Sequence, residues 1–150
     1  MHPEALFSLF STIAMLGWLI LLFLPRRWEW LNRFPALWIP LFLSLGYSLI
    51  IGLHFFQAEG GFDTLANVQQ LFTAPMVALA GWVHYLAFDL LIGSLIARKA
   101  DKLRISRLVQ APILLATFMF GPLGYLLFTL LRSSTLFGLK ALKHTAGSAS

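Results

Sequence analysis

The sequence predicts an all-α integral membrane protein: a four-transmembrane-helix bundle with a short interfacial helix between the second and third spans. Three observations predict this fold class. Apolar residues make up 59% of the 150 residues and charged residues only 11%, whereas a soluble domain carries about a quarter charged residues. Four long apolar runs divide the chain. All eleven lysine and arginine residues lie outside those runs, as the hydrocarbon core of a bilayer requires.

The four predicted spans form one transmembrane domain, residues 1–132. Each is near or above the about 20 residues that a helix needs to cross a hydrocarbon core of about 30 Å. Backbone groups in lipid must pair within their own segment, so we expect helices rather than strands. The spans are Ala5–Leu24, Ala36–Phe56, Pro75–Ala97 and Leu108–Leu131.

Residues that break helices separate or interrupt these spans. Pro25 ends the first span, and Gly60 and Gly61 follow the second. Residues 65–72 have the apolar spacing of a helix, which predicts the short interfacial helix before the third span. Pro122 lies just past the middle of the fourth span, where it predicts a kink or a local opening of the helix.

The distribution of basic residues predicts the orientation. The first and third loops contain eight of the eleven, and the second loop contains none. By the positive-inside rule, the first and third loops are cytoplasmic and both termini lie on the outer side. The loop from Arg98 to Arg107 is also expected to anchor lipid headgroups. Three basic residues oppose this orientation; they are Arg132, Lys140 and Lys143. The tail, residues 133–150, is predicted to be polar and partly disordered.

Composition also restricts the chemistry. The chain contains no cysteine, which excludes disulfides, iron–sulfur clusters and thiolate nucleophiles. The net charge of +5 lies in the loops, so we expect membrane lipids and not nucleic acid as partners. No P-loop, dinucleotide fingerprint or zinc-ligand spacing is present, and the sequence therefore predicts no cofactor and no metal.

The third span contains Asp89, the only acidic residue in any of the four spans. An aspartate near the centre of a transmembrane helix costs about 2.5–3.5 kcal/mol on insertion scales, so its side chain should face the bundle interior. Helical spacing places Trp82 and Tyr85 on the same face as Asp89, and His84 on a flank about 140° away. Asp89 and His84 can therefore line two sides of one interhelical cleft without bonding to each other.

Other candidates have plainer interpretations that stay open. Tyr47 and His54 lie at helical spacing on the second span, and Tyr125 lies in the fourth. The tyrosines can be packing residues, His54 an interfacial histidine, and Asp89 a structural hydrogen-bonding group. A metal site formed by His54, His84 and Asp89 is only weakly indicated, because no i, i+4 ligand pair exists. A Ser-His-Asp hydrolase would need a nucleophile motif that the chain lacks.

The pattern Trp82-x-His84-x4-Asp89 and the later run Phe-Gly-Pro-Leu-Gly at 120–124 resemble the abscisic-acid-deficient-four-like family. The resemblance extends from about Leu6 to Arg132. It implies a four-helix membrane protein whose plant relatives are required to make neoxanthin from violaxanthin in plastids. The chain lacks the plant transit region, so we expect a bacterial-type member in the inner membrane, with both termini periplasmic.

The resemblance implies a cofactor-independent isomerase that acts on an epoxy-carotenoid or a related isoprenoid. Opening an epoxide to an allenic alcohol requires one proton delivered to the epoxide oxygen and another removed from the polyene carbon beside the ring. Asp89 is expected to donate the first and His84 to accept the second. The residues expected to bind the substrate are Trp82, Tyr85, Tyr47, His54 and Tyr125.

Two other functions stay open. The chain can be a non-catalytic protein that binds a carotenoid or lipid, or that assembles with itself or with another membrane complex. A transporter or channel is disfavoured, because four spans with a single buried acid make a poor conduction path.

Overall fold

The computed structural model describes residues 2–147, with side chains described as far as Ser134. The regular secondary structure of these residues is all helical, with no strand, which confirms the predicted all-α class. The elements are α1 (Pro3–Phe23), α2 (Glu29–Arg33), the π-helical turn η1 (Phe34–Trp38), α3 (Ile39–His54), the 3-10 turn η2 (Phe55–Gln57), α4 (Leu65–Leu71), α5 (Pro75–Lys102), α6 (Arg107–Phe120) and α7 (Pro122–Gly147).

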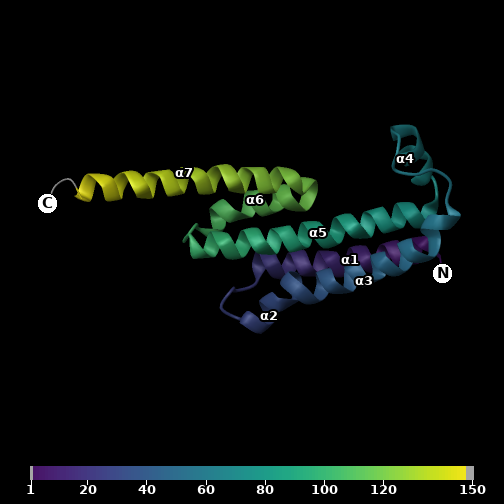
Figure 1. The fold of residues 1–150 in the computed structure, drawn as a ribbon. Coiled ribbons are helices and arrows are strands. Elements are labelled where there is room, and N and C mark those ends of the chain that lie inside the picture. The colour runs from purple at the N-terminus through teal and green to yellow at the C-terminus, as the bar shows by residue number, and fades with distance from the viewer. Residues whose placement is uncertain (1, 148–150) are drawn as a thin grey trace.

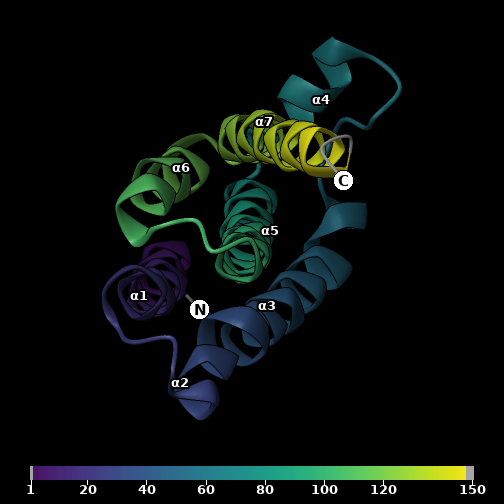
Figure 2. The same cartoon turned by 90° about the vertical axis from the view of Figure 1, so that its left-hand side faces the viewer.

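Three long helices form the main body of the molecule (Figure 1). They are α1 with 21 residues, the continuous helix Glu29–Gln57 with 29, and α5 with 28. Each is apolar and long enough to cross a bilayer core of about 30 Å. Helix α5 packs against both α1 and α3 (Figure 2). These helices are compatible with an integral membrane protein.

The second long helix begins at Glu29, seven residues before the predicted Ala36, and the π-helical turn η1 joins its two parts. In η1 the Ile39 N–H donates to Phe34 O, five residues back. A continued π pattern would pair Pro35 O with the nitrogen of residue 40, but Pro40 has no N–H. The Ser94 hydroxyl of α5 donates to Pro35 O instead, at 2.9 Å, and so pairs this carbonyl and ties the turn to α5.

The predicted fourth span, Leu108–Leu131, is not one helix. Helix α6 ends at Phe120, Gly121 adopts φ +23°, and α7 starts at Pro122. Proline cannot continue the preceding helix but is favoured at the first position of a new one. The two helices lie side by side as a hairpin (Figure 1), and Gly124 lets α7 approach the buried Thr117 of α6. With 14 residues, α6 is about 21 Å long, too short to cross the core.

The hairpin also changes where the chain ends. The two ends of the described chain lie at opposite ends of the bundle (Figure 1), whereas a complete fourth span would bring them to the same end. Helix α7 therefore runs back toward the end where α5 finishes, and Arg132 lies beside Lys99. Arg132, one of the three basic residues that opposed the predicted orientation, thus joins the basic residues of the first and third loops at one end. Disorder was predicted for part of the tail, but the tail is helical as far as Gly147. The remaining residues, 148–150, lie outside the described chain.

The short helix predicted before the third long helix is present as α4. Its N-cap residue is Thr64, whose hydroxyl accepts the Asn67 N–H at 3.2 Å. The Asn67 side chain donates to Asp63 at 2.9 Å, and this hydrogen bond holds the pKa of Asp63 below its ordinary value. Figure 1 places α4 to one side of the long helices, at the end of the bundle where the N-terminus lies.

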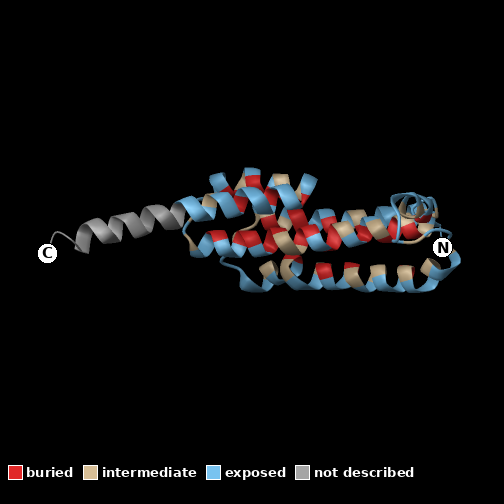
Figure 3. Cartoon of the chain, turned by 45° about the horizontal axis from the view of Figure 1, so that its top comes forward, coloured by how far each residue is buried: buried red, intermediate tan, exposed pale blue. Residues whose placement is uncertain are grey.

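The core follows α5, which carries more buried residues than any other helix with described side chains (Figure 3). One apolar cluster joins α5 to α1 and α3, and a second joins it to α1 and the hairpin. The second depends on a close approach at Gly93, where a Cβ atom would lie 2.5 Å from the ring of the buried Trp18. Helix α5 is therefore the central element on which a site can be built.

Candidate functional site

Asp89 lies on α5 opposite the turn between α6 and α7. Its side chain is only 5% exposed, and a Cβ atom on Gly121 would overlap its Oδ1 atom. Its Oδ2 atom is buried and has no hydrogen-bond partner among the described residues. An unpaired buried carboxyl oxygen is costly unless a proton or another group satisfies it. The turn therefore covers a carboxyl group whose Oδ2 atom can still take up a proton or accept a hydrogen bond.

Tyr85, one helical turn before Asp89, faces the same hairpin. Its hydroxyl group donates to Met119 O at 2.8 Å and lies 3.4 Å from Phe118 O. These carbonyl groups belong to the last turn of α6, where no further N–H of that helix can reach them. The hydroxyl group also lies close enough to Asp89 for the two side chains to interact electrostatically. Tyr85 thus links the end of α6 to the buried carboxyl group.

A cavity of about 480 Å³ lies beside this pair, between α1, α5 and the end of α6. We call it the α1–α5–α6 cavity. Its polar side chains are Ser11, Trp82 and Tyr85, and the other lining residues are apolar or glycine. The Trp82 indole donates to Ser11 Oγ at 3.0 Å, and its ring stacks on Tyr85 with centroids 5.6 Å apart. Such an apolar pocket with few polar groups is typical of sites for hydrophobic ligands.

The structure places His84 away from this cavity. Its ring lies 4.7 Å from the ring of Phe88 and 5.3 Å from that of Tyr47 on α3. His84 does not line the α1–α5–α6 cavity. His84 and Asp89, which were predicted to line two sides of one cleft, instead face different neighbours. Trp82, Tyr85 and Asp89 therefore form one group, and His84 and Tyr47 form another.

The two remaining candidates lie apart from both groups. His54 is half-buried at the end of α3. Tyr125 is 55% exposed on α7 and lines a different cavity of about 220 Å³ between α5 and α7. His54, His84 and Asp89 do not gather as a set of metal ligands anywhere in the described part of the chain.

Sequence reasoning missed three contributors to this site. Ser11 fixes the Trp82 indole, Met119 supplies the carbonyl that Tyr85 binds, and Gly121 makes room for the carboxyl group. Only Gly121 left a signal in the sequence. A Gly-Pro pair marks a turn, and here it reverses the chain instead of bending one helix.

Comparison with known proteins identifies the family. A model of the ABA DEFICIENT 4-like family matches residues 5–128. No curated protein and no solved structure matches the chain. The matched segment extends from α1 into α7 and includes the Trp82, Tyr85 and Asp89 group. Because the match covers most of the sequence, the chain belongs to the ABA DEFICIENT 4-like family.

Proposed function

We propose that the protein takes a long apolar isoprenoid of the carotenoid class from the membrane into the α1–α5–α6 cavity and isomerises it by acid/base chemistry. One observation carries this proposal. Tyr85 lines the cavity, and the buried Asp89, with its unpaired Oδ2 atom, follows it one helical turn later on α5. The family resemblance supports the choice of an epoxy-carotenoid as substrate.

The cavity suits a ligand that is dissolved in the bilayer. Met15 and Met119 line the cavity and are exposed on the apolar surface. The terminal ring of a carotenoid can therefore enter the cavity sideways from lipid without crossing water. The flat faces of Trp82 and Tyr85 offer a stacking surface for a conjugated chain. The remainder of a rod-shaped molecule would then lie along the outside of α1 and α5.

The proposed reaction is an isomerisation in which protons and electrons balance. The Tyr85 hydroxyl group, supplied by Asp89, gives a proton to the epoxide oxygen as the carbon–oxygen bond breaks. The same pair, now short of one proton, removes a proton from the polyene carbon beside the ring. The electrons of that C–H bond form the new double bond, so no oxidant or reductant is needed. The pair replaces His84 as the proton acceptor, because His84 faces Tyr47 and Phe88.

A second candidate function is binding without turnover. Tyr85 also satisfies the carbonyl groups at the end of α6, and Asp89 fills the space beside Gly121. Both residues could hold the hairpin in place while the cavity stores or presents a polyene. This candidate predicts that substitutions of the two residues change stability and not chemistry.

We also propose an orientation in a bacterial inner membrane. The basic residues of the loops that follow α1 and α5 lie at one end, with Arg132 of α7 beside them. The positive-inside rule places that end in the cytoplasm and the N-terminus and α4 on the periplasmic side.

The test is turnover by purified protein in proteoliposomes that contain violaxanthin, with products separated by chromatography. We expect Tyr85→Phe and Asp89→Asn each to lower product formation by at least about 10²-fold while a bound polyene remains visible in the absorption spectrum. Tyr47→Phe and His84→Ala are matched controls from the other group and should keep turnover. Undiminished product from both Tyr85→Phe and Asp89→Asn proteins would refute the mechanism. A wild-type protein that binds the polyene without converting it would favour the second candidate.

A further inference from the structure

A second cavity lies at the basic end of the bundle and shares no lining residue with the first. Its volume is about 640 Å³, and it lies between the end of α1, helix α2 with η1, and the C-terminal part of α5. We call it the basic-end cavity. Three arginines and two carboxylates line it: Arg26, Arg33, Arg98, Glu29 and Asp101. The proposed carotenoid chemistry uses none of them.

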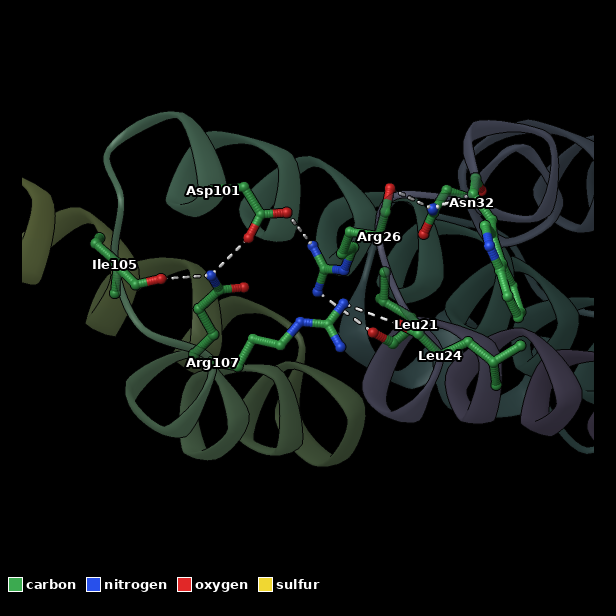
Figure 4. Close-up of polar contacts among 9 residues, drawn as sticks. Leu21, Leu24, Arg26, Asn32, Asp101, Ile105 and Arg107 are labelled. Carbon is green, nitrogen blue, oxygen red and sulfur yellow. Dashed lines mark hydrogen bonds and ion pairs between the residues drawn. The ribbon is translucent and has the colours of Figure 1, made fainter.

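Asp101 is already fully engaged by groups of the protein (Figure 4). Its Oδ2 atom accepts from Arg26 Nη1 at 2.9 Å, and its Oδ1 atom accepts from the buried Gln110 at 2.8 Å. Arg26 also donates to Leu21 O at 3.3 Å. Burial lowers the pKa of Arg26 from its ordinary value, and the neighbouring Asp101 acts in the opposite direction. One arginine and one carboxylate thus neutralise each other.

The other charged groups leave an excess of positive charge. Among the residues with described side chains, only Arg26 and Asp101 form an ion pair. Arg33 and Arg98 therefore have no carboxylate partner among these residues. Both are exposed and line the cavity. Glu29 supplies one further negative charge against these two positive charges. The lining therefore lacks one negative charge that a bound anion could supply.

The rest of the lining determines what kind of anion fits. Leu21, Ala36, Leu37 and Trp38 form an apolar wall, and the side chains of Leu37 and Trp38 are exposed on the outer surface of the helix. Tryptophan at this level is typical of the membrane–water interface. Guanidinium groups bind phosphate oxygens through paired, charge-assisted hydrogen bonds. Phosphate recognition and an apolar wall occur together in this cavity.

One hydrogen bond fixes the backbone segments that carry the two arginines. Arg33 is the last residue of α2, directly before η1, and the Ser94 hydroxyl ties η1 to α5 through Pro35 O. Arg98 lies one helical turn beyond Ser94 on the same α5 helix. The hydrogen bond therefore fixes the two helices that carry the unpaired guanidinium groups, so a ligand has to order only the two side chains and not the backbone.

We infer that the basic-end cavity binds the phosphate group of an anionic amphiphile, with Arg33 and Arg98 as its ligands and the apolar chain along Leu37 and Trp38. This site is separate from the α1–α5–α6 cavity. Free inorganic phosphate presents the same chemistry to the arginines but has no chain for the apolar wall.

Native mass spectrometry of the purified full chain in a mild nonionic detergent tests this inference. The protein is titrated separately with phosphatidylglycerol, with phosphatidylcholine and with inorganic phosphate. We expect phosphatidylglycerol to bind at least about tenfold more tightly than phosphatidylcholine. The Arg33→Ala/Arg98→Ala protein should lose about tenfold or more of that affinity. Binding of inorganic phosphate as tight as that of phosphatidylglycerol, with the same loss, would support the arginine ligands but assign the site to free phosphate.

The matched control is Arg27→Ala/Lys102→Ala, which removes the same charge from exposed residues that do not line the cavity. This protein should bind phosphatidylglycerol nearly as the wild type does. Equal losses in the two double variants would overturn the inference, because they would show general attraction of headgroups to the basic end. Absence of binding by both phosphatidylglycerol and inorganic phosphate would also overturn it. Thermal unfolding of each variant verifies that the fold is retained.

Discussion

Helix α5 forms two interfaces of different character. Toward α1 and α3 it presents aliphatic and small residues such as Ala80, Val83 and Ala87, all buried in one apolar cluster. Toward the α6–α7 hairpin it presents Tyr85 and Asp89. The difference follows from where the neighbouring helices end. A helix that crosses completely pairs its own backbone groups, whereas one that ends inside the bundle leaves carbonyl groups that a side chain must satisfy.

The largest expected effect concerns the direction of the hairpin. If α7 returns toward the basic end, a fluorescent protein fused after Ser150 should fold in the cytoplasm and fluoresce, because the wild-type C-terminus would lie with the basic loops. A periplasmic reporter enzyme fused at the same point should be inactive. Strong activity of the periplasmic fusion together with a dark fluorescent fusion would restore a complete fourth span.

The next largest effect is expected from a small substitution at the glycine of the hairpin turn. In Gly121→Ala the new Cβ atom meets the Asp89 carboxyl group at a backbone φ of +23°. We expect a loss of about 2 kcal/mol or more in the free energy of unfolding, measured by denaturant titration of the protein in detergent micelles. Gly52→Ala is the control, because no atom lies within 4 Å of a Cβ there. It should be neutral or stabilising by up to about 1 kcal/mol, and equal effects of the two variants would contradict the described turn.

A smaller effect is expected from the hydroxyl group that caps α6. Tyr85→Phe leaves Met119 O without its 2.8 Å partner, which should cost about 1–3 kcal/mol because the carbonyl group cannot reach water in lipid. The same denaturant titration measures it. Tyr47→Phe, on the α3 interface, should change the free energy of unfolding by less than about 0.5 kcal/mol. If Tyr47→Phe lowered the free energy of unfolding more than Tyr85→Phe does, the proposed difference between the two interfaces of α5 would be wrong.

The smallest expected effect lies outside both interfaces, in α4. The hydrogen bond that Asn67 donates to Asp63 lowers the pKa of that carboxyl group. The carboxylate therefore stabilises the start of α4 fully at pH values above the unfolded pKa of about 3.9. This contribution should disappear as the pH falls through the lower, folded pKa. Hydrogen exchange of residues 60–72 in the wild-type and Asp63→Asn proteins, compared at equal pH, should differ slightly at pH 6 and converge near pH 2. A difference that persists at pH 2 would contradict this role.

Much of the fold could be predicted because lipid imposes strict demands on a chain. The three long helices follow from apolar length alone, and helical spacing correctly grouped Trp82 with Tyr85. The hairpin could not be found in this way, since Leu108–Leu131 contains no charged residue and hydropathy does not record a reversal of direction. Only Gly121 and Pro122 marked it, and either a kink or a turn was compatible with that pair.

The candidate site was predictable only as far as one helix determines it. The angle between His84 and Asp89 follows from helix geometry, but which neighbour each one faces depends on packing. Tyr47 meets His84 and Gly121 meets Asp89, and neither contact has a signal in local sequence. The arginine-lined cavity was likewise hidden, because Arg33 and Arg98 lie 65 positions apart and only the folded bundle brings them together.

The wide turn at Phe34–Trp38 contains the equivalent of one inserted residue in an otherwise α-helical segment. If the same residues were all wound as an ordinary α-helix, everything before the turn would be rotated by about 100°. Arg33 would then turn away from Arg98 while α3 kept its place in the bundle. The wide turn thus keeps Arg33 on the side of Arg98, which makes the register of this helix a determinant of what the membrane-facing surface can hold.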